Sequence, residues 1–82
     1  MRYDCEVYIR PRTDILDPQG DAVNRALANL GFAGVGDVKV GKFITLAVDA
    51  VSAEAARLQL DEMCRKLLAN PIIEDFTLKI KE

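Results

Sequence analysis

The chain has 82 residues, of which half are hydrophobic and 29% are charged. This composition is typical of one ordered domain, which we expect to span residues 1–82, rather than of a disordered chain. The formal net charge of −2 argues against a nucleic-acid surface, which needs a basic stripe. The sequence contains no His and has Ser52 as its one Ser, so neither a Ser/His nor a Cys/His catalytic dyad can be assembled.

The first predicted element is a strand. Polar and apolar side chains alternate over residues 3–10, and Pro11 follows them, which predicts a strand with one buried face. Cys5 falls on that face, and Cys64 lies beside the apolar stripe of a later helix, so we expect both thiols to be buried and unreactive. The N-terminus is charged and has no apolar run behind it. We therefore expect no secretory leader, no transmembrane segment and a cytoplasmic protein.

A helix is predicted over residues 17–30, and its start is rich in carboxylates. Asp17 suits the N-cap, Pro18 the first helical position, and Asp21 the first turn, where the helix dipole favours negative charge. A metal site made by Asp14, Asp17 and Asp21 is the alternative, but the stretch lacks the ligand spacing of a calcium loop. The capping interpretation is therefore favoured.

Two glycines of this helix have different meanings. Gly20 lies inside the first turn, where helix propensity disfavours glycine by about 1 kcal/mol relative to Ala. Either something packs closely against that turn or the chain bends there, and both fit a contact surface better than a catalytic one. Gly31 follows the last turn and suits a left-handed C-terminal cap, with Phe32 placed to pack back on Leu27.

Two apolar-alternating runs follow, at residues 35–40 and 43–48, and both are predicted as strands. Gly41-Lys42 separates them, and glycine at the first central position of a two-residue loop suits a type II′ hairpin. At the tip of such a hairpin, Lys42 could contact an acidic partner, although a solvated lysine is the plainer expectation.

The last two elements are a helix and a strand. Ser52 offers an N-cap for a second helix of about four turns. Leu58 projects from the charged side of this helix, which is a mild indication of an interface. Asn70-Pro71 ends the helix because the residue before a proline avoids the α region. Residues 76–80 then alternate between apolar and polar in a final strand.

The element order is therefore βαββαβ. It predicts an α+β fold of ferredoxin-like order, a two-layer sandwich whose antiparallel sheet carries both helices on one face. The other face of the sheet is left open, and in a chain this short we expect dimerisation to extend or cover the sheet.

Three segments carry a resemblance to a known family: LDPQGDAV at 16–23, VKVGKF at 38–43 and NPIIEDF at 70–76. Together they are similar to the small S subunit of phosphoribosylformylglycinamidine synthase, an enzyme of purine biosynthesis. The resemblance spans about residues 3–81 and lies in three segments of matching order and spacing.

The resemblance implies a subunit that has no activity of its own. It implies a homodimer, sometimes a dimer of dimers, that bridges a glutaminase subunit and an ATP-dependent synthetase subunit and is needed for transfer of glutamine-derived ammonia. It implies no catalytic residue, metal or cofactor in this chain. ATP and Mg belong to the synthetase of this glutamine-dependent C–N ligase.

The interface residues carried over by the resemblance, together with the exposed leucine of the second helix, are Asp17, Pro18, Gln19, Gly20, Gly41, Lys42, Leu58, Asn70 and Pro71. We hypothesise that the first four form a helix-start surface that faces a partner subunit or the dimer mate. A second hypothesis is that the final strand, or the hairpin at 38–43, pairs across the dimer and extends the sheet.

Three other functions stay open at this point. A dimeric small-molecule-sensing regulatory domain would share the βαββαβ order but should place a Gly-rich loop after the first strand, which the DPQG stretch matches only in part. An RNA-binding module would need exposed aromatics such as Tyr8 and Phe43 together with a basic surface, and the acidic balance counts against it. An enzyme acting alone is the least favoured.

Overall fold

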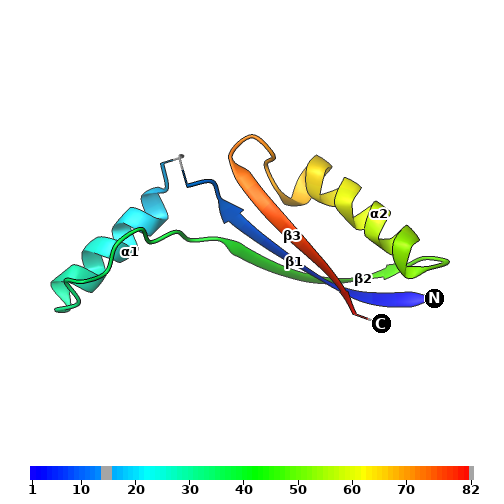
Figure 1. The fold of residues 1–82 in the computed structure, drawn as a ribbon, viewed down its shortest axis with the longest axis horizontal. Helices are drawn as coiled ribbons and strands as arrows, with labels where there is room; N and C mark the ends of the chain where they lie inside the picture. The colour runs from blue at the N-terminus through cyan, green and yellow to red at the C-terminus, as the bar shows by residue number, and fades with distance from the viewer. Residues whose placement is uncertain (14–15, 82) are drawn as a thin grey trace.

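The computed structural model describes residues 1–13 and 16–81. Its three strands, two α-helices and one π-helical turn are drawn in Figure 1. In chain order, the elements are β1 (Arg2–Pro11), α1 (Pro18–Asn29), β2 (Lys42–Asp49), α2 (Ala53–Met63), η1 (Cys64–Leu68) and β3 (Glu74–Lys81).

The sheet has β1 at its centre, in the order β2-β1-β3, and both neighbours run antiparallel to it. Val7 of β1 lies between Ile44 of β2 and Leu78 of β3, and all three side chains face the same side of the sheet. The predicted α+β class and antiparallel sheet are therefore confirmed.

The core lies between the sheet and α2. The four apolar side chains of β1 that the alternation assigned to one face are buried, namely Tyr3, Cys5, Val7 and Ile9. From the helix, Leu60 and Cys64 are fully buried against them. Burial raises the pKa of both thiols, with smaller contributions from neighbouring charges. The predicted burial of both cysteines is confirmed.

The N-cap of α2 is also confirmed, since Ser52 Oγ accepts a hydrogen bond from the Ala55 amide at 3.1 Å. The end of this helix differs from expectation, because residues Cys64–Leu68 form a π-helical turn in which the Ala69 amide donates to the Cys64 carbonyl at 2.9 Å. This wider turn returns the chain to the sheet with Cys64 and Ala69 both buried.

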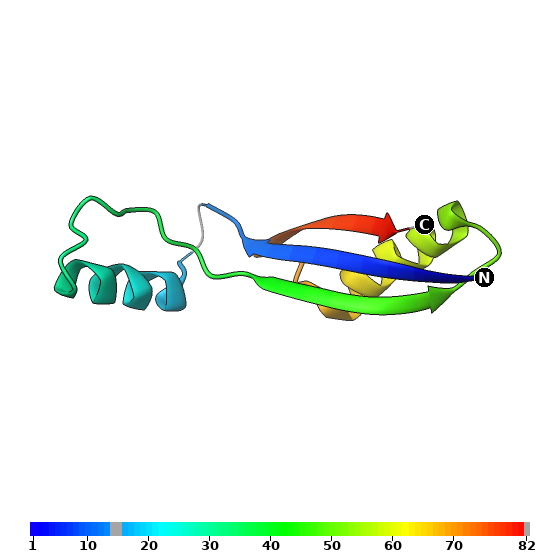
Figure 2. The ribbon, with the colours of Figure 1, turned by 90° about the horizontal axis from the view of Figure 1, so that it is seen from below.

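The position of α1 differs from the prediction that both helices share one face. Figures 1 and 2 show α1 projecting beyond the end of the sheet, while α2 alone lies over it. The Cα radius of gyration is accordingly 16.2 Å, against about 12 Å for a compact chain of this length. We call α1 and the chain that returns from it, residues 18–41, the arm.

The segment 35–40, predicted as a strand, is not one. Residues 36–41 lie outside helices and strands and return along α1 toward the sheet. The predicted type II′ hairpin at Gly41-Lys42 is therefore wrong as well, because Lys42 is the first residue of β2. In the described part of the chain, no helix is long and apolar enough to span a membrane.

Candidate functional site

The three segments that carried the family resemblance meet at one end of the sheet, where the arm joins it. The Val40 amide donates a hydrogen bond of 2.8 Å to Asp17 Oδ2, which ties segment 38–43 to segment 16–23. Lys42 Nζ lies 4.0 Å from Glu74 Oε2, which brings segment 70–76 to the same place. We call this region the joint.

Asp17 holds the joint through its side chain. It occupies the N-cap position of α1 as predicted, and its carbonyl accepts the Asp21 amide at 2.9 Å. Its carboxylate makes no capping hydrogen bond to its own helix and instead accepts from Val40, 23 residues away. The side chain is 8% exposed, and the Val40 amide, helped by the nearby Gly20 amide, holds the pKa of Asp17 below its ordinary value.

Two glycines let the backbone close up at the joint. A Cβ on Gly20 would lie 2.1 Å from the Val38 carbonyl oxygen, and one on Gly41 would lie 2.2 Å from the Ile9 carbonyl oxygen. Real Cβ atoms do not approach backbone so closely, so both positions require glycine. The close packing expected at Gly20 is therefore present, and it comes from the chain's own return segment.

Arg12 contacts the turn before β3 through hydrogen bonds and an ion pair, and so holds that turn at the joint. Its backbone amide donates to the Ile73 carbonyl at 3.0 Å, and its Nη2 donates to the Pro71 carbonyl at 2.8 Å. Its Nε lies 3.4 Å from Asp75 Oδ1. The turn itself is built on Asn70, whose Oδ1 accepts the Ile72 amide at 3.1 Å. Asn70 and Pro71 thus lie at the joint, although their visible contacts are within the chain.

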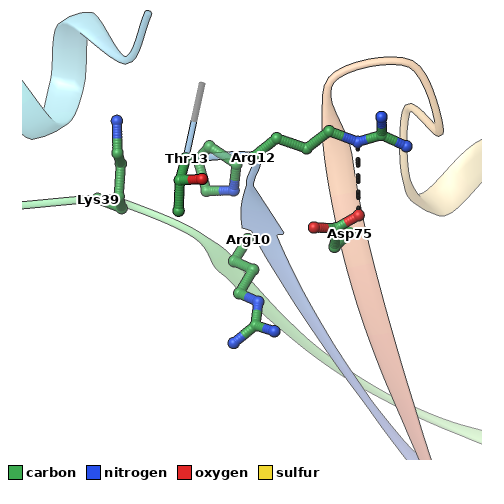
Figure 3. Close-up of a pocket in the computed structure, with 6 residues that line it drawn as sticks. Arg10, Arg12, Thr13, Lys39 and Asp75 are labelled. Atoms are coloured by element: carbon green, nitrogen blue, oxygen red, sulfur yellow. Dashed lines mark ion pairs between the residues drawn. The ribbon is translucent and has the colours of Figure 1, made fainter. Parts of the chain in front are cut away.

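A shallow hollow of about 730 Å³ opens at the joint, as Figure 3 shows. Its charged lining residues are Arg10, Arg12, Lys39 and Asp75. The three cationic side chains point in different directions rather than toward one centre, and Arg12 is paired with Asp75. This arrangement fits a protein surface better than a pocket that encloses a small ligand.

Sequence reasoning missed these cationic residues. They are single charges spread over two segments, and only the fold brings them together. Their local net charge is positive, in a chain whose formal net charge is −2. The structure thus adds a small positive area to the joint, beside the residues selected from the sequence.

The remaining candidate residues are placed in two regions. Pro18, Gln19 and Lys42 are exposed at or beside the joint. Leu58 does not belong there: it is 68% exposed on α2, where it lines a hollow beside Phe76 and Leu78 of β3.

The serine and cysteine side chains of the described residues are engaged in the fold. The hydroxyl of Ser52 caps α2, and both thiols are buried. No group of three His, Cys, Asp or Glu side chains that could hold a metal is found within residues 1–13 and 16–81. Asp14, one ligand of the alternative metal site, lies outside the described residues.

The aromatic pair required for an RNA-binding surface is present on the open face of the sheet. The rings of Tyr8 and Phe43 stack on each other with centroids 4.9 Å apart. The Tyr8 hydroxyl donates to Glu6, whose negative charge lies beside the rings. Glu6 is in turn paired with Lys81, whose Nζ lies 3.1 Å from Glu6 Oε2. Because the two rings already stack on each other, they are poorly placed to stack nucleic-acid bases.

Comparison with known proteins decides the family. The model of the PurS family, described as phosphoribosylformylglycinamidine (FGAM) synthase, matches residues 4–82. The chain belongs to the PurS family. The resemblance inferred from three short segments is thereby confirmed over nearly the whole chain.

PurS proteins from other organisms support the assignment. The chain is 44% identical over 78 residues to PurS of Synechocystis sp., covering 95% of this chain and 78% of that protein. It superposes on Bacillus subtilis PurS with a TM-score of 0.87 at 39% identity, covering 98% of this chain and 99% of that one. A chain in the structure of PurLQS from Thermotoga maritima gives a TM-score of 0.87 at 26% identity, with 99% of each chain covered.

Proposed function

We propose that this PurS chain bridges the glutaminase and ATP-dependent synthetase subunits of phosphoribosylformylglycinamidine synthase and supports transfer of glutamine-derived ammonia between them. The observation that carries this proposal is the similarity, over 99% of the chain, to a chain of the T. maritima PurLQS structure. The joint supports the bridging function. All three family segments meet there, and they are held together by backbone contacts rather than by reactive side chains.

The proposed subunit acts in the cytoplasm and has no activity alone. The sequence lacks His altogether, and its hydroxyl and thiol candidates serve in capping and in the core. We assign ATP and Mg to the synthetase partner, and glutamine hydrolysis to the glutaminase. The contribution of this chain is to position those two proteins, which is a matter of surface and geometry.

The proposed subunit works as a homodimer, and its exposed area supports self-association. The chain exposes 5982 Å², whereas a compact monomer of this mass exposes about 4,900 Å². The excess of about 1,100 Å² is comparable with the roughly 800 Å² that each partner buries in a standard interface. Covering such an area with a second copy would give this small chain the burial that its own core lacks. A further pairing of dimers into a tetramer would use any apolar area that remains.

A dimeric small-molecule-sensing regulatory domain is the second candidate, and the hollow at the joint is the observation that favours it. Its diverging cations and its open form make this the weaker proposal. Isothermal titration with glutamine, ADP and the formylglycinamide ribonucleotide would test it, and tight binding of any of them to this chain alone would favour this alternative.

The bridging function is tested by reconstitution. The glutaminase and the synthetase are mixed with and without this protein, and product formation is followed with glutamine and, separately, with ammonia as nitrogen source. Glutamine-dependent synthesis should require this chain, whereas ammonia-dependent synthesis should need it far less. Equal glutamine-dependent rates in its absence would refute the proposal.

A further inference from the structure

The open face of the sheet carries an exposed aromatic pair at the end nearest the joint. Tyr8 of β1 and Phe43 of β2 are direct neighbours in the antiparallel ladder, and their rings stack on each other. The two residues are nevertheless 46% and 56% exposed, because α2 packs on the opposite face of the sheet. A contiguous apolar patch of this kind is a feature of interaction sites, whereas single exposed apolar residues are ordinary.

Arg10 connects the aromatic pair to the positive area at the joint. It lies two residues after Tyr8 in β1, so its side chain projects from the same face of the sheet. It lines both a hollow of about 290 Å³ beside the rings and the larger hollow of the joint. In that larger hollow, Asp75 is the one carboxylate among the described lining residues, against three cationic side chains. We define the cationic aromatic surface as Tyr8, Arg10, Arg12, Lys39 and Phe43.

The composition of this surface fits contact with a protein. Tyr and Arg are among the residue types that most often carry the binding energy of protein interfaces. The stacked pair is already ordered, so an incoming partner loses little affinity to the fixing of these side chains. The local charge is positive in a chain whose formal net charge is −2. Charge complementarity therefore selects a partner surface that is rich in carboxylates.

We propose that the cationic aromatic surface docks an acidic patch on one of the two partner subunits, with carboxylates of that subunit facing Arg10 and an apolar side chain lying on the two rings. This inference rests on the proposed bridging function and specifies the surface for one of the two contacts that bridging requires. The attraction between exposed opposite charges is screened by salt, so this contact weakens as ionic strength rises.

Two arginines of β1 provide a matched test. Arg10 and Arg2 are both exposed on the open face, and each lies opposite an aspartate in the ladder, Asp75 and Asp49 respectively. They lie at opposite ends of the strand, roughly 27 Å apart at the usual rise per residue. Arg10→Glu reverses a charge of the proposed surface, and Arg2→Glu makes the same change outside it. Circular dichroism and sedimentation would establish that both variants fold and self-associate as the wild type does.

The readout is the concentration of this chain that gives half of the maximal glutamine-dependent rate, at fixed amounts of the glutaminase and the synthetase. Arg10→Glu should raise this concentration by at least about tenfold, and so should Tyr8→Ala, which removes the stacked pair. Arg2→Glu should leave it within about twofold of wild type, as expected of a surface charge outside the contact. Added NaCl should raise it for wild type and less for Arg10→Glu.

Equal half-maximal concentrations for Arg10→Glu and Arg2→Glu would overturn the inference. A loss with Arg10→Glu that follows altered self-association would overturn it as well, because the surface would then contact a second copy. Arg10→Gln removes the charge without placing a carboxylate beside Asp75, and it provides the same comparison if the reversal does not fold. A wild type that does not support glutamine-dependent synthesis would instead refute the bridging function itself.

Discussion

At the scale of single residues, Asp17 is a carboxylate whose ionisation strengthens the contact at the base of the arm. Its carboxylate accepts the Val40 amide, and that bond lowers its pKa below the ordinary value of 3.8. Because the folded pKa is the lower one, the stabilisation is fully present above about pH 4 and is lost as the pH falls through the folded value. The Val40 amide resonance, followed by NMR, should therefore titrate with a midpoint below 3.8.

The control for this titration is Asp17→Asn, which keeps the shape of the side chain and removes the charge. The variant should abolish the titration of Val40 and increase hydrogen exchange in the arm. A Val40 resonance that still titrates in the variant would show that another carboxylate causes the shift.

The leucines of α2 give a second prediction at this scale. Leu60 is fully buried beneath the sheet, and Leu58, two residues earlier, is 68% exposed. Leu60→Ala should lower the free energy of unfolding by about 2–5 kcal/mol, because it removes buried methyl groups and leaves a cavity. Leu58→Ala should change it by no more than about 0.5 kcal/mol. Urea unfolding at one fixed protein concentration measures both, and equal losses would contradict the assigned burial.

Sequence reasoning succeeds for residues whose role depends on near neighbours. Gly31 has the positive φ of 101° expected of its cap, and the Phe32 amide donates to the Leu27 carbonyl at 2.9 Å, as the Schellman motif requires. The role of Asp17 could be predicted only in part, because its side-chain partner is 23 residues away. Arg12 was missed for the same reason, since its contacts are made with the distant β3 turn.

At the scale of elements, the alternation over 35–40 was real but its cause was misjudged. Val38 and Val40 are half-buried and Lys39 is exposed, as in a strand, but this segment runs along α1 and joins no ladder. Gly41 likewise suited a turn, yet the structure needs it for close approach to the Ile9 carbonyl. A period of two records which side of an extended segment is covered, and it does not identify the covering element.

The arm should lose its order when the glycine contact at its base is removed. Gly20→Ala forces a Cβ against the Val38 carbonyl, and backbone atoms of both segments must then separate. A helix of 12 residues is marginal by itself, so protection of the α1 amides from hydrogen exchange should fall at least tenfold. The sheet amides should be unchanged, because few contacts join the arm to them.

The matched control is Gly34→Ala, in the same arm, where an added Cβ meets nothing within 4 Å and φ is not in the left-handed region. This variant should keep the protection of wild type. If Gly20→Ala also kept the wild-type protection of the α1 amides, the close backbone approach at Gly20 would not be the cause of the arm's order.

At the scale of the whole molecule, the chain is extended and exposes more surface than a compact monomer of its mass, so a partner that covers this surface would stabilise it. Its 51 Å length and its excess exposed area come largely from an arm that leaves the sheet. If a second copy covers part of this area, stability depends on protein concentration by mass action. The thermal midpoint of wild type should therefore rise with protein concentration. Calorimetry over a hundredfold range of concentration checks this, and a midpoint that does not change with concentration would contradict self-association.

Self-association and bridging are both proposals, and substitutions at the joint test the second of them without altering the sheet. The family segments gather at the joint, at one end of the sheet, and the arm extends beyond it. Gly20→Ala should therefore leave the dimer intact in sedimentation and lower glutamine-dependent synthesis in the reconstituted enzyme severalfold, with ammonia-dependent synthesis little changed. Gly34→Ala should do neither. If Gly20→Ala supported full glutamine-dependent activity, an ordered arm would not be needed for ammonia transfer, and the partners would have to be held by the sheet and α2 instead.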